Sequence, residues 1–431
     1  MAKLTVRSFP FEISKPKFVE TIRSCLYEMN RVEEISIDIF PGLTFEEIFR
    51  GLPKSAPQLH TLRIQSCRPP DPSTGTAFSI HEDFLYDTER LKRVELLNCK
   101  ISWDSRILTG LTCLTLEDTS INQFLLALQR MPALTDLHLK NSIPDDLELS
   151  SIYPVVDLPC LRVLGISSGV NALNAFLRRI SFSHSTILDL TCKEDRSTQI
   201  DFSNFLSFLT TKFLSSLVIR SLRLEVFPFM DNDGLEFCFW TTAIIHDYFP
   251  TSQPQLTVVL TWPSGSSLPT ESPQPYSIYN KTLTCAFDAM ILPFLAQLQI
   301  STFNYIDSQT WVKTFGKLPL LEWVCVRVLE AYSFLEALVY KTNAAQESKA
   351  AHRNVSLPKL RYIHLADTDF RGSVPVFISV DMLLDYLTER HKRNAEVQVL
   401  RLENCYSILS KDVERFKKFV VDVIWDGVER R

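Results

Sequence analysis

One hydrophobic pattern recurs along most of the chain. It consists of a leucine, two variable residues, a second leucine, one variable residue and a third aliphatic residue, often with a proline two residues ahead, as in Pro57-Gln-Leu59-His-Thr-Leu62-Arg-Ile64. Further copies start at Val32, Leu91, Leu111, Leu134, Leu161, Leu214, Leu295, Leu321, Leu360 and Val397, and Pro254-Gln-Leu256 opens a degraded copy. Because residues two apart in a strand face the same side, the last two apolar positions predict a short strand with one buried face.

The segments between these strands have helical spacing of apolar residues. They predict helices over 17–30, 121–130, 171–180, 202–214, 235–248, 308–315, 334–342 and 381–390. A strand and a helix that repeat every 20 to 30 residues or so are typical of leucine-rich repeats. One repeat cannot bury its own apolar face, so neighbouring copies must stack. We therefore expect an α/β fold, a leucine-rich-repeat solenoid with a curved parallel sheet on the concave face and helices on the convex face.

The organisation predicted along the chain is a single domain over 1–431. Its parts are a helix at 17–30, regular repeats over 31–222, an irregular insertion over 223–290 with a Pro- and Ser-rich loop at 250–275, repeats over 291–408, and a capping helix at 410–427. The apolar face of that last helix would be formed by Val413, Phe416, Phe419, Val420, Val423 and Ile424.

A small residue often follows the third apolar position by three residues. These residues are Cys67, Cys99, Thr119, Ser142, Gly169, Thr368 and Cys405. A short polar side chain suits a tight turn in which it reaches backbone groups. We therefore expect each strand to end in such a turn.

Composition narrows the chemistry. The 431 residues are 45% hydrophobic and 22% charged, which is typical of a globular chain, and a net charge of −5 does not favour a nucleic-acid partner. The ten cysteines form no CxxC pair and the eight histidines no HxxxH pair, so we expect free thiols, no metal site and no cofactor. The N-terminus has no apolar signal segment and no stretch would span a bilayer well, which favours a monomer in the cytoplasm or nucleus.

Two motifs have more than one interpretation. Gly165-Ile-Ser167-Ser-Gly169 matches the GxSxG elbow of serine hydrolases, but it occupies the turn position of a repeat, and no partner Asp, His or oxyanion loop is evident. The basic run Arg390-His-Lys-Arg393 complements the dipole at the end of a helix, with a nuclear signal as the alternative.

The outward positions of the strands form the candidate binding surface. If the leucines face inward, the alternating residues of stacked repeats align in lanes. The central lane contains Arg63, Glu95, Thr115, His138, Gly165, Gln299, Cys325, His364 and Arg401. The first flanking lane adds Arg93, Asp136, Trp323 and Tyr362, and the second flanking lane adds Glu117, Lys140, Arg327 and Glu403. Mixed charge with a few aromatic residues suits a protein partner better than a nucleic acid.

At these residues the chain resembles the leucine-rich-repeat region of fungal F-box proteins, those of mushroom-forming fungi in particular. The proline-led repeats, the Leu402-Glu-Asn-Cys405 ending and the closing Val423-Ile-Trp-Asp-Gly427 carry the resemblance. In that family an N-terminal F-box docks the adaptor of a cullin–RING ubiquitin ligase, and the repeats bind the substrate. The F-box is not found here, so we expect that it was lost or lies upstream of Met1.

The functional prediction is a non-enzymatic protein-interaction module that recognises the substrate of an F-box-like ubiquitin ligase. Its partner would be a protein, with the ligase adaptor as a second partner if an F-box exists upstream. The alternatives are a structural scaffold without a link to ubiquitin and a serine hydrolase acting through Ser167.

Overall fold

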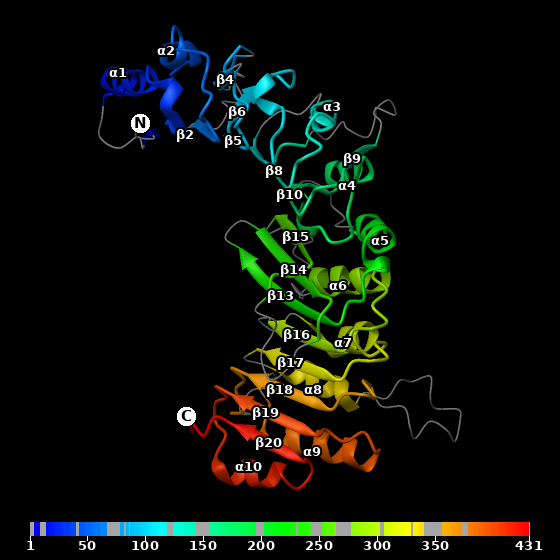
Figure 1. Ribbon diagram of the computed structural model, residues 1–431. Coiled ribbons are helices and arrows are strands. Elements are labelled where there is room, and N and C mark those ends of the chain that lie inside the picture. The colour runs from blue at the N-terminus through cyan, green and yellow to red at the C-terminus, as the bar shows by residue number, and fades with distance from the viewer. Residues whose placement is uncertain are drawn as a thin grey trace, which may run out of the picture. The chain divides into compact units, whose positions relative to one another are not determined.

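The chain is an α/β protein in which the leucine-pattern strands lie side by side in a mostly parallel sheet (Figure 1). The computed structural model describes residues 4–8, 14–39, 43–66, 78–81, 83–85, 87–118, 124–143, 155–194, 202–229, 232–243, 252–263, 277–301, 306–328, 331–339, 356–371 and 378–430. These residues belong to two compact units, Met1–Lys193 and Glu194–Arg431, whereas the sequence predicts one domain. The division lies inside the range 31–222 that was predicted as regular repeats.

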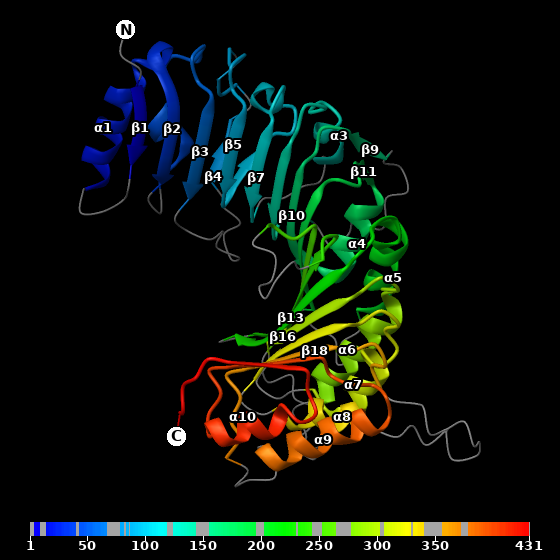
Figure 2. The ribbon, with the colours of Figure 1, turned by 60° about the horizontal axis from the view of Figure 1, so that its bottom comes forward.

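The strands of the first unit are all parallel. In sheet order they are β1 (Leu4–Ser8), β2 (Val32–Ile39), β3 (Thr61–Ser66), β5 (Arg93–Leu97), β7 (Cys113–Glu117), β8 (Asp136–Lys140), β10 (Val163–Gly169) and β12 (Ile187–Lys193) (Figure 2). The connections contain α1 (Lys15–Leu26), α2 (Phe45–Phe49), α3 (Phe124–Leu128), α4 (Val170–Arg178), the 3₁₀ turns Met29–Arg31 and Arg106–Leu108, and the small parallel pairs β4 (Phe78–Ile80) with β6 (Cys99–Ile101) and β9 (Val156–Leu158) with β11 (Ile180–Phe182).

The second unit has longer helices. Its sheet order is β15 (Leu256–Pro263), β14 (Asn232–Trp240), β13 (Ser221–Phe229), β16 (Gln297–Ser301), β17 (Trp323–Arg327), β18 (Tyr362–Ala366), β19 (Val399–Glu403) and β20 (Asp422–Trp425). The helices are α5 (Ser203–Lys212), α6 (Ser277–Ala289), α7 (Ser308–Thr314), α8 (Tyr332–Val339), α9 (Val380–Lys392) and α10 (Ser410–Phe416), and α6 to α9 pack in succession along one face of the sheet (Figure 1). None of the helices that the structure describes has both the length and the apolar character to cross a bilayer.

The pattern leucines form the core. Leu62, Leu137 and Leu298, each at the second apolar position, are fully buried, as are the third-position residues Ile64 and Ile300. Each such side chain contributes roughly 1.5–3 kcal/mol by its removal from water. Burial at every second residue fixes the strand register, because a slip by one residue would expose the whole apolar set.

Most of the described residues within the predicted insertion over 223–290 belong to regular elements, namely β13, β14, β15 and α6. Of the segment 235–248, which was predicted to be helical, residues 235–240 lie in β14, where Leu235, Phe237 and Phe239 alternate toward the core, and residues 244–248 lie outside the described ones. β14 pairs antiparallel with both β13 and β15. Part of the predicted loop 250–275 is the strand β15, and residues 264–275 lie outside the described ones. The prediction failed because a short apolar run fits either period.

Two further boundaries differ from the prediction. The repeat copy placed at Leu214 is out of register, since the strand starts at Ser221 and the buried positions are Ile219, Leu222 and Leu224. The helix predicted over 410–427 ends at Phe416, and Val423 and Ile424 lie in β20, which pairs with β19.

The basic run at the end of α9 is only partly exposed. Arg390 is fully buried and donates hydrogen bonds from its guanidinium to the carbonyl oxygens of Ser356 (2.9 Å), Leu357 (3.1 Å), Leu360 (3.4 Å) and Ala395 (3.1 Å). Arg390 therefore connects the helix end to the segment before β18, which is a structural role.

Five of the strands that the structure describes, β5, β7, β8, β18 and β19, end in the same short turn. Its first residue has a left-handed backbone, with φ between 48° and 57° at Asn98, Asp118, Asn141, Asp367 and Asn404. Asn and Asp tolerate this conformation better than other residues that carry a side chain. The next residue is the predicted small one, and in most copies its side chain donates to backbone carbonyls.

These donors connect successive strands. The Thr368 hydroxyl donates to the carbonyl of Val328, just after β17, at 3.0 Å, and the Cys405 thiol lies 3.4 Å from the carbonyl of Leu365, the last but one residue of β18. Cys99 makes the same contact with Ile64, at 3.6 Å. The expectation that these small side chains reach backbone groups is confirmed at these three positions.

Strand entry is equally regular. A carbonyl just before one strand accepts two N–H groups from the next, as when Thr112 accepts from Thr135 (2.8 Å) and Asp136 (3.0 Å). In the second unit, Glu322 accepts in the same way from Arg361 and Tyr362. Strand entry is thus held in the same way at most of the parallel junctions that the structure describes.

Candidate functional site

The register of the strands aligns the outward residues in the rows predicted from the sequence. In the first unit, Arg63, Glu95, Thr115, His138 and Gly165 are successive partners across β3, β5, β7, β8 and β10. In the second unit, Gln299, Cys325, His364 and Arg401 are successive partners across β16 to β19. The same register adds Asp189 of β12 to the first row and Arg223 of β13 to the second. Neither residue was predicted from the sequence, because β12 lacks the first leucine of the pattern and Arg223 lies in the range predicted to be an insertion.

The flanking lanes are aligned as well. Arg93 and Asp136 share the first flanking lane in one unit, and Trp323 and Tyr362 share it in the other. Glu117 and Lys140 are partners in the second flanking lane, and so are Ala366 and Glu403, with Arg327 beside Ala366. The candidate residues of each unit therefore lie close together because neighbouring strands pair in the same register.

Charges on the first unit largely neutralise one another. Arg63 lies between two carboxylates, 2.8 Å from Asp38 and 3.6 Å from Glu95. Glu95 also accepts from the Arg93 Nε at 2.6 Å. The row Asp38, Arg63, Glu95, Arg93 is thus an ion-pair network across β2, β3 and β5, and such a network orients its side chains before any partner arrives.

His138 and Lys140 lie on β8, which is separated from β5 by β7. The Lys140 ammonium lies 2.6 Å from a carboxylate oxygen of Glu117 and remains 56% exposed. The imidazole of His138 leans over Gly165, where a Cβ would lie 2.4 Å from the His138 Nδ1 atom. Only glycine leaves room for this ring position.

The second unit departs from the prediction of a solvent-facing lane. His364 is 5% exposed, Cys325 3% and Trp323 9%. The Trp323 ring stacks on Tyr362 at 5.6 Å between centroids and meets the His364 ring edge-on. Direct contact of a partner with His364 or Trp323 is therefore not supported. The template could not show this burial, because it depends on large side chains at neighbouring outward positions.

A thiol, an imidazole and a carboxylate meet in this buried part of the lane. The Cys325 Sγ lies 3.4 Å from the His364 Nδ1, and the His364 Nε2 lies 3.3 Å from a carboxylate oxygen of Glu403. This order is that of a nucleophile, a base and an orienting acid.

The protonation states argue against an activated nucleophile. Burial raises the pKa of the Cys325 thiol to about 12. Burial, followed by the positive charge of Arg401, lowers the pKa of the His364 imidazole to about 4. Both groups are therefore neutral near pH 7, and the thiolate that attacks a substrate is not formed. The contact is a neutral polar pair within the sheet face.

Arg327 and Tyr362 are the accessible candidates of the second unit. The Arg327 side chain is 46% exposed and lies 3.5 Å from the carboxylate of Asp367, and Tyr362 is half-buried. The Arg401 side chain is only 13% exposed and lies 3.1 Å from Glu403, whose side chain is 29% exposed. Arg401 and Glu403 thus support the surface more than they present it.

Ser167 does not occupy the elbow that a serine hydrolase needs. It lies inside β10, which pairs with strands on both sides, and not in the turn position that the sequence suggested. His138 and Asp189 lie near it around the same pocket, but the described residues show no hydrogen bond between the Ser167 hydroxyl and the His138 ring. No nucleophile and base are therefore in hydrogen-bond contact there.

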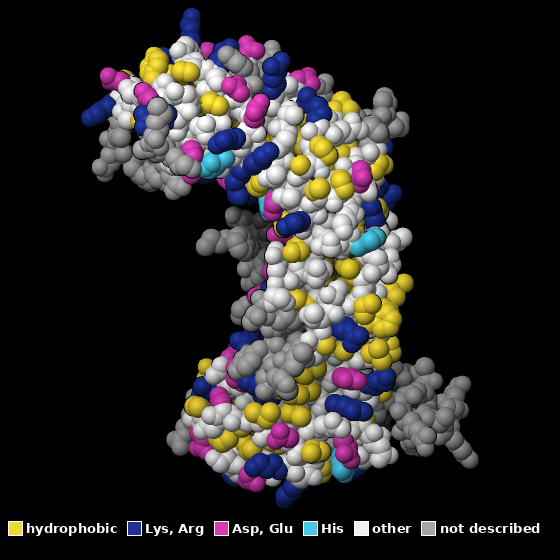
Figure 3. Space-filling model, viewed as in Figure 1, with side chains coloured by type: hydrophobic (Ala, Val, Ile, Leu, Met, Phe, Trp, Pro, Cys, Tyr) yellow, Lys and Arg dark blue, Asp and Glu magenta, His cyan; other side chains and the backbone are white. Residues whose placement is uncertain are grey.

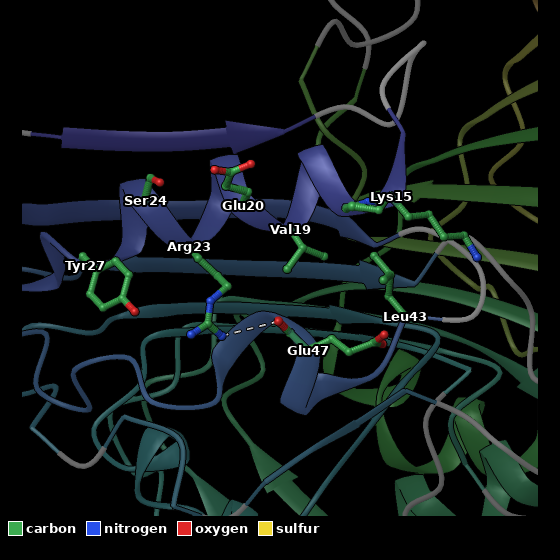
Figure 4. A pocket seen from close by; sticks show the side chains of 9 residues that line it. Lys15, Val19, Glu20, Arg23, Ser24, Tyr27, Leu43 and Glu47 are labelled. Atoms are coloured by element: carbon green, nitrogen blue, oxygen red, sulfur yellow. Dashed lines mark hydrogen bonds between the residues drawn. The ribbon is translucent and has the colours of Figure 1, made fainter.

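A groove lies between α1 and α2 in the first unit. Its volume is about 600 Å³, and Val19, Tyr27 and Leu43 contribute its apolar surface (Figure 4). Arg23 crosses from α1 and donates to the carbonyls of Glu47 and Ile48 at 3.4 Å (Figure 4). Arg23 thereby joins the two helices, and the charged side chains of Lys15, Glu20 and Glu47 also line the groove.

The described residues support neither a metal site nor a surface patch on which charges of one sign gather. Within them, no group of three His, Cys, Asp or Glu side chains could hold a metal ion. Basic and acidic side chains are interspersed on the face of the molecule drawn in Figure 3. The nine cysteines that the structure describes are free thiols, six of them buried.

Comparison with protein-family models finds no matching family, and a search of curated proteins finds no similar sequence.

Proposed function

We propose that the chain is a leucine-rich-repeat solenoid that binds a protein partner through the outward face of its sheet, and that it selects the substrate of an F-box-type ubiquitin ligase. The strand register carries the proposal. It keeps the pattern leucines inside and gathers variable, charged and aromatic side chains in rows outside. A preformed surface of this kind loses little conformational entropy when a partner docks.

The side chains that would contact the partner are those that remain accessible. Arg93 is 53% exposed, Lys140 56% and Arg327 46%, and Tyr362 offers an aromatic face. Arginine and tyrosine contribute strongly to protein interfaces. Buried lane residues would hold these side chains in position.

Affinity capture with the full chain tests the binding surface. The double variant Arg93→Glu with Arg327→Glu reverses one charge in each unit and should reduce capture of the partner at least about tenfold. The matched control is Lys54→Glu with Lys317→Glu, two exposed cations that pair with Asp83 and Asp288 away from the lanes. Equal capture by the two double variants, both shown to be folded by circular dichroism, would refute the assignment of the lanes.

The link to ubiquitin rests on the resemblance of the repeats and of the closing segment to F-box proteins. A pull-down of the full chain with the purified cullin–RING ligase adaptor tests it separately. If the chain binds a partner but neither it nor a longer form of the protein binds the adaptor, the protein is a scaffold and the ligase proposal fails.

A further inference from the structure

A pocket of about 320 Å³ opens on the outward face of β7, β8, β10 and β12. The side chains that give it polar character are those of Thr115, Glu117, His138, Lys140, Ser167, Asp189 and Thr191. All four strands belong to the first unit. The pocket therefore lies within the central and second flanking lanes, where the proposed function places a partner.

Gly165 is the reason that the face is hollow here. It occupies the central lane between His138 and Asp189, and the next outward residue along β10 is Ser167. Since any Cβ at Gly165 would collide with the His138 ring, the glycine lets that imidazole lie against the strand as one wall. Asp189 and Thr191 on β12 form the opposite wall.

The charges around the pocket favour a cation. Among the described residues that line the pocket, Glu117 and Asp189 are carboxylates and Lys140 is the ammonium group, which lies 2.6 Å from Glu117. The hydroxyls of Ser167 and Thr191 can accept hydrogen bonds as well. An incoming anion would meet both carboxylates, whereas an incoming cation would meet a lysine that is held to one side.

The shape favours a guanidinium among cations. Its planar fork donates two parallel hydrogen bonds to one carboxylate, and its flat face stacks on aromatic rings. Here the carboxylate of Asp189 and the ring of His138 stand on opposite sides of Gly165. A lysine ammonium could pair with the carboxylate, but it has no planar face to stack on the ring.

We propose that the pocket over Gly165 binds an arginine side chain of the protein that docks on the first unit. This inference rests on the proposed function for the source of the arginine. The pocket itself can be tested without any partner.

The probe is N-acetyl-arginine-methylamide, added to the full-length protein with its histidines labelled at the imidazole carbon. We expect the His138 signal, assigned with His138→Gln, to shift in a saturable manner. N-acetyl-citrulline-methylamide has the same shape without the charge and should bind at least about tenfold more weakly, because it lacks the charge-assisted hydrogen bonds.

Asp189→Asn should weaken binding of the arginine probe about tenfold or more. Its matched control is Asp157→Asn, an exposed aspartate on β9 outside the lanes, which should leave binding unchanged. Gly165→Ala should alter the His138 signal of the free protein and weaken the probe. Both aspartates are exposed, so loss of folding will not mask the comparison.

Three results would overturn the inference: no saturable shift of His138, equal binding of the citrulline probe, or a stronger response to inorganic phosphate than to the arginine probe. Failure of the arginine probe with intact partner capture contradicts the pocket alone. Binding of the probe together with equal partner capture by the two double variants contradicts the proposed function alone.

Discussion

At the scale of single residues, the turns after the strands show what the sequence reveals and what it hides. The small residues were predictable, because Cys99, Thr368 and Cys405 follow the template at a constant distance. The left-handed Asn or Asp before them was not predicted, although Asn98 and Asn404 stand at a constant position too. This residue is selected for its ability to adopt a left-handed backbone, which the hydrophobic pattern does not show.

His364 makes stability dependent on pH. Its pKa is lowered to about 4 in the folded protein, below the usual 6.5, so between these values only the unfolded chain binds the proton. Stability from this group is complete above about pH 6.5 and is lost as the pH falls toward 4. From about pH 7.5 to about pH 5 the loss should be about 2 kcal/mol.

Urea unfolding at the two pH values measures this loss, and the comparison with His364→Gln isolates it. The glutamine has no proton to gain, so the variant should lose about 2 kcal/mol less than the native protein over the same interval. If the two proteins lose equal stability, His364 is not the group responsible.

At the scale of elements, the strands of the leucine pattern were predictable and the segment 223–290 was not. Strand positions follow from apolar residues at a spacing of two, which is why β3, β8 and β18 lie where the template puts them. β14 was misassigned because an aromatic run without polar alternation fits a helix equally well. β20 was misassigned because Val423 and Ile424 continue the helical spacing of α10, and only pairing with β19 selects the strand.

Arg390 should be essential to the packing of α9. The variant Arg390→Met keeps most of the side-chain volume but removes the donors that four backbone carbonyls now share. We expect the free energy of unfolding to fall by about 3 kcal/mol or more, because buried carbonyls would lose their partners. Chemical denaturation measures this change.

The neighbouring Lys392→Met serves as the control, because Lys392 is exposed on the same helix and should change stability by about 0.5 kcal/mol or less. Similar effects of the two substitutions would mean that the helix end tolerates the loss of the buried guanidinium.

At the scale of the whole molecule, alignment of the lanes was predictable and their exposure was not. The common register of the strands places Arg63 beside Glu95 and Cys325 beside His364, whatever side chains stand at these positions. Exposure depends on the size of neighbouring outward residues. The repeat pattern does not specify these residues, and Trp323 and Arg401 stand at such positions. The sequence therefore predicts which residues share a surface, but not which of them a partner can reach.

The charge balance of the chain predicts weak retention on polyanions. With 45 basic and 50 acidic residues, and ion pairs across the lanes, the protein should elute from a heparin column at or below about 0.15 M salt. Retention to much higher salt would reveal a basic patch and reopen the case for a nucleic-acid partner.

The paired N–H groups at each strand entry have a consequence for how such a chain can change in length. At most of the parallel junctions that the structure describes, the carbonyl just before one strand accepts the N–H groups at the start of the next. A gene duplication that adds one whole strand and its return segment would therefore find matching hydrogen-bonding groups on both sides. A fragment of a repeat meets none. Related chains of this architecture should therefore differ in length by whole strand-and-return segments. Each added or deleted segment would change the outward residues available to a partner and leave the interior pattern unchanged.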